Sequence, residues 1–556
     1  MSARGWQRTR QTIQVLALLF FIILFIGSGS NRLTPLCVPP RLCASALSSP
    51  VELFFRLDPL VALTATLAGR ALVSGFALAG LTLLLTLLFG RVWCGWLCPL
   101  GTLLEWIGPL RRSGQARRHV HRRPPPEKWR AIKYLLLVAI LMAALLGNQT
   151  LLFADPMAIL TRTMATAIWP AFRYAVTQAE AFLYQFRPLW GALDALHRAI
   201  IQPLFQELEP SFILAVPMAL FLVGLVALNW WAERFWCRYL CPLGGLLGLL
   251  SKLSLVRREV SDTCARCARC VHQCPTDTID PGDNYRSDPA ECIVCFDCLV
   301  NCTREGADKI RPIGFRWLSG APRQLPRWRP ARWHAYDPTR RQLLAAMGAS
   351  VAGVVLAGVE PIVRQEPVTM VRPPGATLTD FSALCIRCGA CMRVCPTQGL
   401  QPSFFEGGVQ HIMTPRLEPR LGYCSFSCNA CGQVCPTGAI PNLTLEEKQH
   451  TPIGLARIDR DRCLPWAYNI PCIVCEEACP VAHKAIWLEE AEVENAQGER
   501  IVLQRPRVVK ELCIGCGICE YQCPMGGESA IRVYAPTEVG AYLGYESELG
   551  RHSGNG

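Results

Sequence analysis

The sequence predicts a multi-domain protein in which a polytopic α-helical membrane domain is joined to small α+β ferredoxin-like domains. Three observations predict this. The mean hydropathy is positive, at +0.23. Apolar segments long enough to cross about 30 Å of hydrocarbon recur along the first part of the chain. Of the 30 Cys, 24 form six groups of four, with the spacing of iron–sulfur ligands and not of a secreted disulfide framework.

A chain of 556 residues is long enough for several domains. Changes in apolar content, charge and Cys spacing divide it into five parts. These are a four-helix membrane domain with two Cys-x3-Cys-Pro motifs (1–258), a two-cluster ferredoxin domain (259–312), a basic linker (313–341), an apolar segment (342–360) and a four-cluster domain (361–556).

The four membrane helices are expected at residues 11–31, 71–90, 134–154 and 210–232. Residues 60–69 are apolar but too short to span, so they predict a re-entrant or interfacial helix. The basic N-terminus resembles that of a signal peptide, but the three similar segments that follow argue for a retained helix.

Charge in the connecting loops predicts the orientation. Loop 91–130 carries nine Lys and Arg, against four in loop 155–209 and three in loop 32–58. By the positive-inside rule, the N-terminus, loop 91–130 and residues 233–341 lie in the cytoplasm. The same rule explains the net charge of +13 better than nucleic-acid binding does, and we expect no nucleic-acid partner.

An uncharged segment at residues 342–359 follows Arg340 and Arg341. Twin Arg before an apolar segment rich in small residues is typical of a Tat export signal, and the alternative is an ordinary fifth transmembrane helix. Both interpretations put residues 361–556 in the periplasm. Cleavage near 357–361 stays open.

The run from Cys264 to Cys302 contains two Cys-x2-Cys-x2-Cys-x3-Cys quartets, the bacterial pattern for two [4Fe–4S] clusters. In this pattern three Cys wrap one cluster and the fourth reaches the neighbouring cluster. Thr303 replaces the usual Pro after the last Cys, which changes no ligand. The expected ligands are Cys264, Cys267, Cys270 and Cys302 for one cluster, and Cys292, Cys295, Cys298 and Cys274 for the other.

Four more quartets follow in the last domain, which brings the expected number of [4Fe–4S] clusters to six. They are Cys385, Cys388, Cys391 and Cys395; Cys424, Cys428, Cys431 and Cys435; Cys463, Cys472, Cys475 and Cys479; and Cys513, Cys516, Cys519 and Cys523. The middle two are irregularly spaced, which favours nested pairing, first with fourth and second with third. Sequential pairing is the alternative. Zinc is disfavoured because the quartets interlock.

Two further Cys pairs form an internal repeat. Cys94 and Cys98 lie in Arg-Val-Trp-Cys-Gly-Trp-Leu-Cys-Pro-Leu-Gly, and Cys237 and Cys241 lie in the matching Arg-Phe-Trp-Cys-Arg-Tyr-Leu-Cys-Pro-Leu-Gly. The repeat predicts two similar halves around a pseudo-symmetry axis. Since i, i+4 spacing faces one side of a helical turn, the four thiols are candidates for a redox dithiol or a metal site; packing is the alternative.

The remaining pair, Cys37 and Cys43, falls in an external loop, where a disulfide or two free thiols are both compatible with the compartment. The sequence has no Cys-x-x-Cys-His haem motif and no His in its five apolar segments. His197, His272 and His411 are isolated, and no nucleophile–base constellation is recognisable, so the catalytic residues are not identified.

Two families resemble this combination of motifs. Residues 1 to about 312, with four helices, two Cys-x3-Cys-Pro motifs and the double quartet, resemble the NapH family of membrane ferredoxin-type subunits. Residues from about 337 resemble the NapG/MauM family, periplasmic four-cluster subunits with a twin-Arg leader. The departure is that both occur on one polypeptide.

The resemblance implies a bacterial inner-membrane quinol dehydrogenase. It would take electrons from the membrane quinone pool and pass them to a periplasmic c-type cytochrome and a terminal reductase, such as periplasmic nitrate reductase. We expect quinol near Trp93, Trp96 and Trp236, beside the Cys-x3-Cys-Pro turns. The alternatives are electron supply for maturation or maintenance of a periplasmic metalloenzyme, or a non-enzymatic scaffold whose clusters recruit a reductase.

Overall fold

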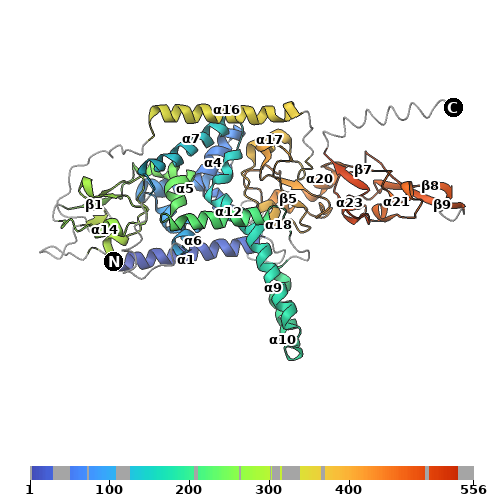
Figure 1. Ribbon diagram of the computed structural model, residues 1–556, viewed down its shortest axis with the longest axis horizontal. Coiled ribbons are helices and arrows are strands. Elements are labelled where there is room, and N and C mark those ends of the chain that lie inside the picture. Colours follow the sequence, from blue (N-terminus) through green and yellow to red (C-terminus); the bar gives the residue numbers. More distant parts are fainter. Residues whose placement is uncertain are drawn as a thin grey trace. The chain divides into compact units, whose positions relative to one another are not determined.

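The computed structural model describes residues 3–28, 51–71, 74–107, 125–205, 211–261, 264–300, 302, 313–315, 338–364, 370–494 and 500–535. The chain folds into two compact units (Figure 1). The first unit is built from the described parts of residues 1–26, 50–160 and 219–352. The second is built from those of residues 27–49, 161–218 and 353–556.

Helices form the centre of the first unit. α13 (Pro242–Ser251) packs against α4 (Pro59–Gly69), α5 (Ala77–Phe89) and α7 (Ala131–Leu145), and α4 also contacts α5 and α7 (Figure 1). Other helical segments in this part include α1 (Ala3–Gly27), α3 (Glu52–Arg56), η2 (Ser74–Phe76), α6 (Pro99–Ile107), η6 (Glu127–Arg130) and η7 (Thr150–Ala154).

Helices occur at all four predicted positions, but three are shorter than predicted. α5 is shorter because it begins at Ala77 and not at residue 71; it ends at Phe89, beside the predicted end. α7 ends at Leu145, and Gly147 just beyond it has a positive φ of 74°, which glycine adopts at low cost. The fourth, α12 (Ala215–Ala227), continues into the short helix η11 (Leu228–Trp230). Among the described residues, α1 is the one helix both long and apolar enough to cross a membrane.

The predicted short helix is present as α4. The Asp-Pro pair that begins it occurs again at the start of a later helix. Asp58 caps α4 by accepting a hydrogen bond from the Leu60 amide at 2.8 Å. Asp155 caps α8 (Pro156–Thr163) in the same way, accepting from the Met157 amide at 2.9 Å. Each Asp precedes a Pro at the first helical position, which suits an N-terminus. The two Asp side chains are buried and hydrogen-bond to each other.

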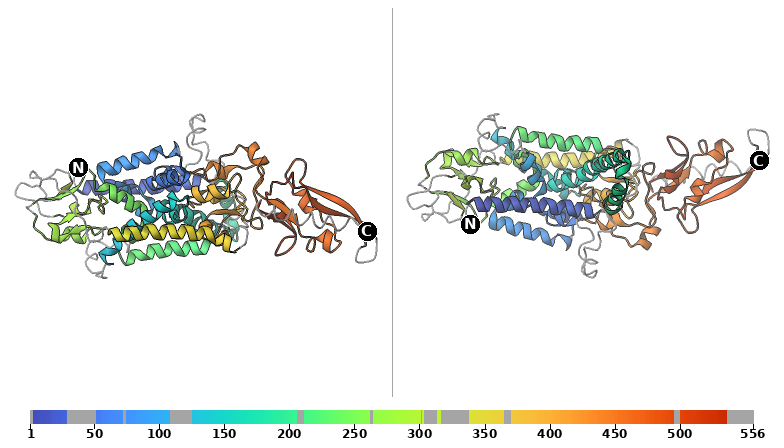
Figure 2. Two further views of the ribbon diagram at one scale, coloured as in Figure 1. Left: turned by 90° about the horizontal axis from the view of Figure 1, so that it is seen from above. Right: turned by 90° about the horizontal axis from the view of Figure 1, so that it is seen from below.

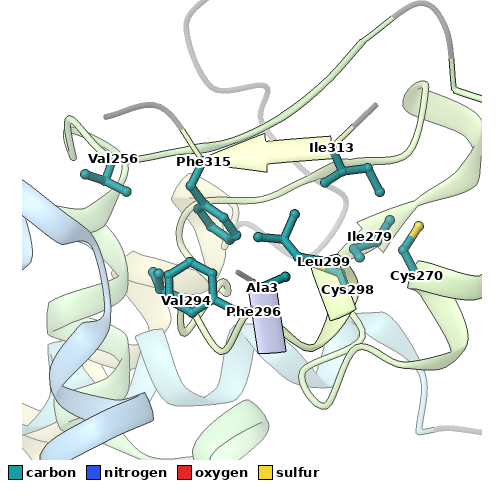
Figure 3. Packing of buried hydrophobic residues seen from close by; sticks show 10 residues of the cluster. All are labelled: Ala3, Val256, Cys270, Ile279, Val294, Phe296, Cys298, Leu299, Ile313 and Phe315. Atoms are coloured by element: carbon teal, nitrogen blue, oxygen red, sulfur yellow. The ribbon is translucent and has the colours of Figure 1, made fainter. Parts of the chain in front are cut away.

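A small α+β domain completes the first unit. β1 (Arg258–Val260) pairs antiparallel with β4 (Ile313–Phe315), and β2 (Ile279–Asp280) with β3 (Arg286–Ser287). The short helices are η13 (Pro281–Asp283), α14 (Arg269–His272) and α15 (Asp297–Val300). Phe296 and Phe315 pack edge to face with ring centroids 4.9 Å apart. Both belong to a core that also includes Ala3 at the start of α1 (Figure 3).

One long helix has residues in both units. α16 (Arg340–Arg364) covers the segment predicted as a Tat signal or a fifth transmembrane helix. The Ser350 hydroxyl donates a 2.8 Å hydrogen bond to the Ala139 carbonyl, which holds this part of α16 against α7. The first half of α16 is thus part of the helical packing of the first unit.

The second unit combines helices of residues 161–218 with the Cys-rich domain. The helices are η8 (Met164–Ile168), α9 (Trp169–Leu183), η9 (Arg187–Leu189), α10 (Trp190–Leu196), η10 (His197–Ile201) and α11 (Gln202–Leu204). The helical segments of the Cys-rich domain are α17 (Leu378–Leu384), α18 (Ala390–Val394), η14 (Val409–His411), α19 (Ala430–Gln433), α20 (Leu445–His450), α21 (Leu464–Ala467), α22 (Val474–Glu477) and α23 (Ile518–Gln522).

Short antiparallel strands bracket the Cys-rich loops, as expected for the small α+β ferredoxin-like domains that the sequence predicts. β5 (Leu400–Pro402) pairs with β6 (Pro415–Leu417), and β7 (Leu455–Ile458) pairs with β10 (Ile531–Tyr534). A longer hairpin of β8 (Ile486–Glu494) and β9 (Arg500–Val508), coloured red-orange in Figure 2, was not predicted. Its alternating side chains are a strand signal, since every second residue faces the same side.

Candidate metal centres

Four cavities in the second unit are each lined by four Cys. Each takes three Cys from one quartet and the fourth Cys of another. The lining sets are Cys385, Cys388, Cys391 and Cys435; Cys424, Cys428, Cys431 and Cys395; Cys463, Cys472, Cys475 and Cys523; and Cys513, Cys516, Cys519 and Cys479. The cavities enclose between about 330 and 420 Å³, open solvent included.

These sets decide how the quartets pair. The first quartet exchanges its fourth Cys with the second, and the third exchanges with the fourth. The nested pairing predicted from the irregular spacing is therefore wrong. The extra residues between Cys463 and Cys472 instead form α21, so the irregularity reflects a local insertion and says nothing about the partner quartet.

The four regular quartets share one loop conformation. The residues on both sides of the second Cys adopt left-handed backbone angles, and a short helix then begins. The pairs are Arg266 and Ala268, Val294 and Phe296, Arg387 and Gly389, and Gly515 and Gly517. Successive residues of alternating handedness turn backbone N–H groups to one side and form an anion-binding concavity. This geometry suits a set of thiolates.

Backbone amides donate to the sulfur atoms of the second unit. Ile440 donates to Cys435 at 3.4 Å, Ala456 to Cys513 at 3.4 Å and Ala485 to Cys479 at 3.3 Å. Burial and neighbouring thiols raise the pKa of Cys463 to about 11 and that of Cys475 to about 12. Since a thiolate is the form that binds iron, cluster binding would release these protons.

In the first unit, Cys274 joins Cys292, Cys295 and Cys298 around a cavity of about 310 Å³ that Arg258 also lines. This is the set that the spacing predicts for one cluster. Cys264 and Cys267 lie within electrostatic range of Cys270, and Cys302 packs near the same core. Cys37 and Cys43 lie outside the described residues.

The Cys-x3-Cys-Pro repeats do not form the α-helical turns that the sequence predicts. Residues Trp93–Leu97 (η3) and Trp236–Leu240 (η12) are single π-helical turns. They are closed by amide–carbonyl bonds of 2.9 Å from Cys98 to Trp93 and from Cys241 to Trp236. The following Pro starts α6 in one repeat and α13 in the other, which explains the break. Single π-turns are frequent at functional sites.

Each repeat also sends an Arg to the other, a feature that sequence reasoning missed. Arg234 donates to the Cys94 carbonyl at 3.1 Å and pairs with Glu105. Arg91 lies against Gly244, where an added Cβ would come within 2.7 Å of its Nη2. Both copies of the motif are preceded by an Arg in the sequence. Only the three-dimensional structure shows that each Arg contacts the other copy.

The first repeat packs directly on the loop that carries Cys292 and Cys295. A Cβ on Gly95 would lie 2.3 Å from the Ile293 carbonyl oxygen, and the Trp96 indole donates to the Val294 carbonyl at 3.1 Å. Arg91 donates to the Ala290 carbonyl at 2.8 Å. The thiols of this repeat and a four-Cys cavity are therefore neighbours within the first unit.

A comparable contact occurs in the second unit. The Arg162 guanidinium donates to the Arg387 carbonyl at 3.1 Å, and Gly389 lies so close that an added Cβ would be 3.1 Å from the Arg162 Cα. Arg393 stacks over the Trp169 ring at 4.5 Å. The loop carrying Cys385 and Cys388 thus packs on the helices of residues 161–218.

Two of the three isolated histidines have defined partners. His197 contacts the Glu180 carboxylate at 2.7 Å, and His411 is buried beside Arg372. Within the described part of the chain, no three His, Cys, Asp or Glu side chains are grouped closely enough to hold a single metal ion. A cubane cluster does not require such a group, because each of its four thiolates binds a different iron atom.

Comparison with known families supports iron–sulfur binding at both ends of the chain. A family described as "4Fe-4S binding domain" matches residues 71–117 and again residues 214–261, the two copies of the repeat. A "4Fe-4S dicluster domain" family matches residues 384–439, and a second "4Fe-4S binding domain" family matches residues 506–527. The dicluster match covers the two quartets that exchange Cys395 and Cys435.

Curated relatives align with part of the chain. The methylamine utilization ferredoxin-type protein MauM of Methylorubrum extorquens is 36% identical over 217 residues, 37% of this chain and 92% of the relative. The ferredoxin-type protein NapG of Haemophilus influenzae is 31% identical over 231 residues, 39% of this chain and 78% of the relative. Protein NirI of Paracoccus denitrificans is 29% identical over 219 residues, 38% of this chain and 25% of the relative. No solved structure matches the chain.

Proposed function

Because the chain belongs to the family of ferredoxin-type proteins that includes MauM and NapG, we propose that it is a membrane-bound electron-transfer protein. It oxidises quinol and passes the electrons to a periplasmic c-type cytochrome and a terminal reductase. The aligned stretch of 217 residues is close to the length of the Cys-rich C-terminal part. We assign the MauM/NapG-like portion to residues from about 337 and a NapH-like portion to residues 1–312.

Six four-Cys sets hold the [4Fe–4S] clusters in this proposal. Five of the sets line cavities in the structure, and the sixth consists of Cys264, Cys267, Cys270 and Cys302. Such clusters supply one-electron transfer at potentials set by hydrogen bonds to sulfur and by burial. The protein's contribution is the buried thiols, the left-handed loops and the N–H groups that donate to sulfur.

The contact between a repeat and a cluster loop carries the proposal. Gly95 and Trp96, in the Cys-x3-Cys-Pro turn at the end of an apolar helix, pack on Ile293 and Val294. These two residues flank ligands of the second cluster set. A quinol bound among the apolar helices would therefore be close to an iron–sulfur site, which electron transfer requires.

Contacts within each unit support a multi-pass topology. In the first unit, Arg10 makes a two-pronged ion pair with Glu105 at 2.9 and 3.0 Å, and Gln7 bonds Asp297 at 2.7 Å. These join three segments that the positive-inside rule assigns to the cytoplasm. In the second unit, residues 161–218 pack with the domain beyond α16. We infer that this unit is periplasmic.

The test is reduction by quinol. Protein in membranes, kept anaerobic, is mixed with a menaquinol analogue, and cluster reduction is followed by EPR. We expect reduced-cluster signals with the quinol and none with the oxidised quinone. Signals that appear only after dithionite would contradict quinol oxidation while showing that the clusters are intact.

A second function remains supported by the buried thiols of the repeats: electron supply for the maintenance of a periplasmic metalloenzyme. Replacing Cys94 and Cys237 by Ser separates the two. If quinol still reduces the six cluster sets but the client enzyme loses activity in cells, the maintenance function is favoured. If quinol reduction itself is lost, the thiols belong to the quinol pathway.

A further inference from the structure

Four buried thiols lie outside the six quartets. Cys94, Cys98, Cys237 and Cys241 are between 5 and 9% exposed, and they come from the two copies of the internal repeat. Two π-turns bring them together: every one of the six possible pairs lies within electrostatic range. Two separate dithiols would not need all four side chains to converge.

The same convergence occurs in the quartets that line cavities. Cys391, for example, lies within electrostatic range of Cys385, Cys388 and Cys435, the other three Cys of its set. Each set consists of thiols from two loops. The four repeat thiols reproduce this arrangement with two turns in place of two loops.

Hydrogen bonds to sulfur follow the same pattern. The Gly101 amide donates to the Cys98 sulfur at 3.4 Å, and the Gly244 amide donates to the Cys241 sulfur at 3.2 Å. In the quartets the corresponding amide–sulfur distances are 3.3 to 3.4 Å. Both glycine amides belong to the first turn of a helix, where N–H groups have no helical partner and favour a negative charge.

Buried positive charge surrounds the four thiols. Arg91 and Arg234 are 1 and 2% exposed and lie within electrostatic range of Cys94 and Cys237 respectively. Lys133 also lies within electrostatic range of Cys237. Glu291 pairs with both Arg91 and Lys133, and one positive charge remains in that group. Four thiolates on a cluster carry net negative charge, which buried cations would offset.

We propose that Cys94, Cys98, Cys237 and Cys241 together ligate one further [4Fe–4S] cluster, a seventh site shared by the two halves of the repeat. The family description matched by both copies agrees with iron–sulfur binding. The site adjoins the cavity of Cys292, Cys295, Cys298 and Cys274 through Gly95 and Trp96. It is independent of the identity of the electron donor, so a failure of the quinol test does not affect it.

Iron content of the full-length, anaerobically purified protein tests this site. Seven clusters predict about 28 iron and 28 acid-labile sulfide per chain, and six predict about 24. Cys94→Ser alone, Cys237→Ser alone and the double variant should each lose the same amount, about four iron, because the two residues share one cluster. A variant with both Cys37→Ser and Cys43→Ser is the control. It also removes two thiols, but its iron content should equal that of the wild type.

Three results would overturn the proposal. The first is unchanged iron in both single variants, which would indicate a dithiol. The second is loss of about one metal atom, which would indicate a single ion. The third is a double variant that loses twice as much as each single variant, which would indicate two separate sites. If a variant fails to assemble, the wild-type count decides, since about 24 iron excludes a seventh cluster.

Discussion

His411 shows how the fold controls the charge of a single residue. Its ring is buried, and Arg372 Nη2 lies 3.3 Å from His411 Nδ1. Burial, followed by the charges of Arg372 and Arg387, lowers the pKa of His411 to about 3. The folded protein therefore keeps this histidine neutral at pH values at which an unfolded chain would protonate it, near 6.5 and below.

The sign of the resulting pH effect follows from proton binding. Below pH 6.5 the unfolded state binds a proton that the folded state rejects, so stability falls as pH falls from 6.5 towards 3. Between pH 7.5 and pH 5 we expect His411 to reduce the free energy of unfolding by about 2 kcal/mol. His411→Gln should lose this component, measured by denaturant unfolding at both pH values. His483→Gln, at an exposed position, is the control and should keep the pH-dependent component of stability. Equal pH dependence of the free energy of unfolding in wild type and His411→Gln would contradict the argument.

Residue types and spacing were sufficient to identify the cluster ligands as candidates. The interval of two residues between Cys is short enough to fix a loop, and Gly389, Gly515 and Gly517 mark its left-handed positions. The exchange of Arg91 and Arg234 between repeats was not predictable. Both arginines look like loop charges in the sequence, and their burial depends on contacts with residues far away in the chain.

At the scale of elements, one aromatic residue attaches the insertion α21 to the β8–β9 hairpin at several points. The Trp466 indole donates to the Pro506 carbonyl of β9 at 3.1 Å. Three guanidinium groups surround its ring at 4.5 to 5.2 Å, from Arg460, Arg505 and Arg507. Trp466 thus ties the residues after Cys463 to the β8–β9 hairpin and positions one wall of a cluster cavity.

Trp466→Leu should loosen this attachment. Loss of the cation–π contacts and of one hydrogen bond is expected to cost about 2 kcal/mol. Trp487→Leu is the matched control, because Trp487 lies on β8 with 46% of its surface exposed; its effect should stay within about 0.5 kcal/mol. Thermal bleaching of the visible cluster absorption measures both. Equal shifts in the two variants would show that Trp466 has no special role.

Element positions were predicted better than element ends or pairings. Apolar runs located α1, α5, α7 and α12, whereas α5 begins later and α7 ends earlier than hydropathy indicated. The repeated Asp-Pro of Asp58 and Asp155 went unnoticed because its spacing differs from that of the Cys repeat. Quartet pairing was predicted wrongly because the length of a connection does not specify which loop lies across the cavity.

At the scale of the whole molecule, each unit combines segments that are distant in sequence. The first unit joins the N-terminus, α6 and the first ferredoxin domain through Arg10, Glu105 and Asp297. The second joins residues 161–218 to the last domain through Arg162 and Arg387. In the proposed topology, the positive-inside rule assigns the first set of segments to the cytoplasm and the second to the periplasm. Charge and packing are independent features of the chain, and the proposal requires them to agree.

Reporter fusions test this topology. Alkaline phosphatase, which is active in the periplasm, should be active when fused after Gly556 and inactive when fused after Arg123 in loop 91–130. A fluorescent protein that matures in the cytoplasm should show the reverse.

Replacing Arg340 and Arg341 together by Lys should abolish the activity of the Gly556 fusion if Tat exports the folded domain, because Tat recognises the twin Arg. Lys keeps the positive charge beside α16, and an ordinary membrane helix requires only that charge. Retained activity of the Gly556 fusion would therefore identify α16 as an ordinary fifth transmembrane helix. Phosphatase activity at Arg123, or none at Gly556 in the unmodified chain, would contradict the topology itself.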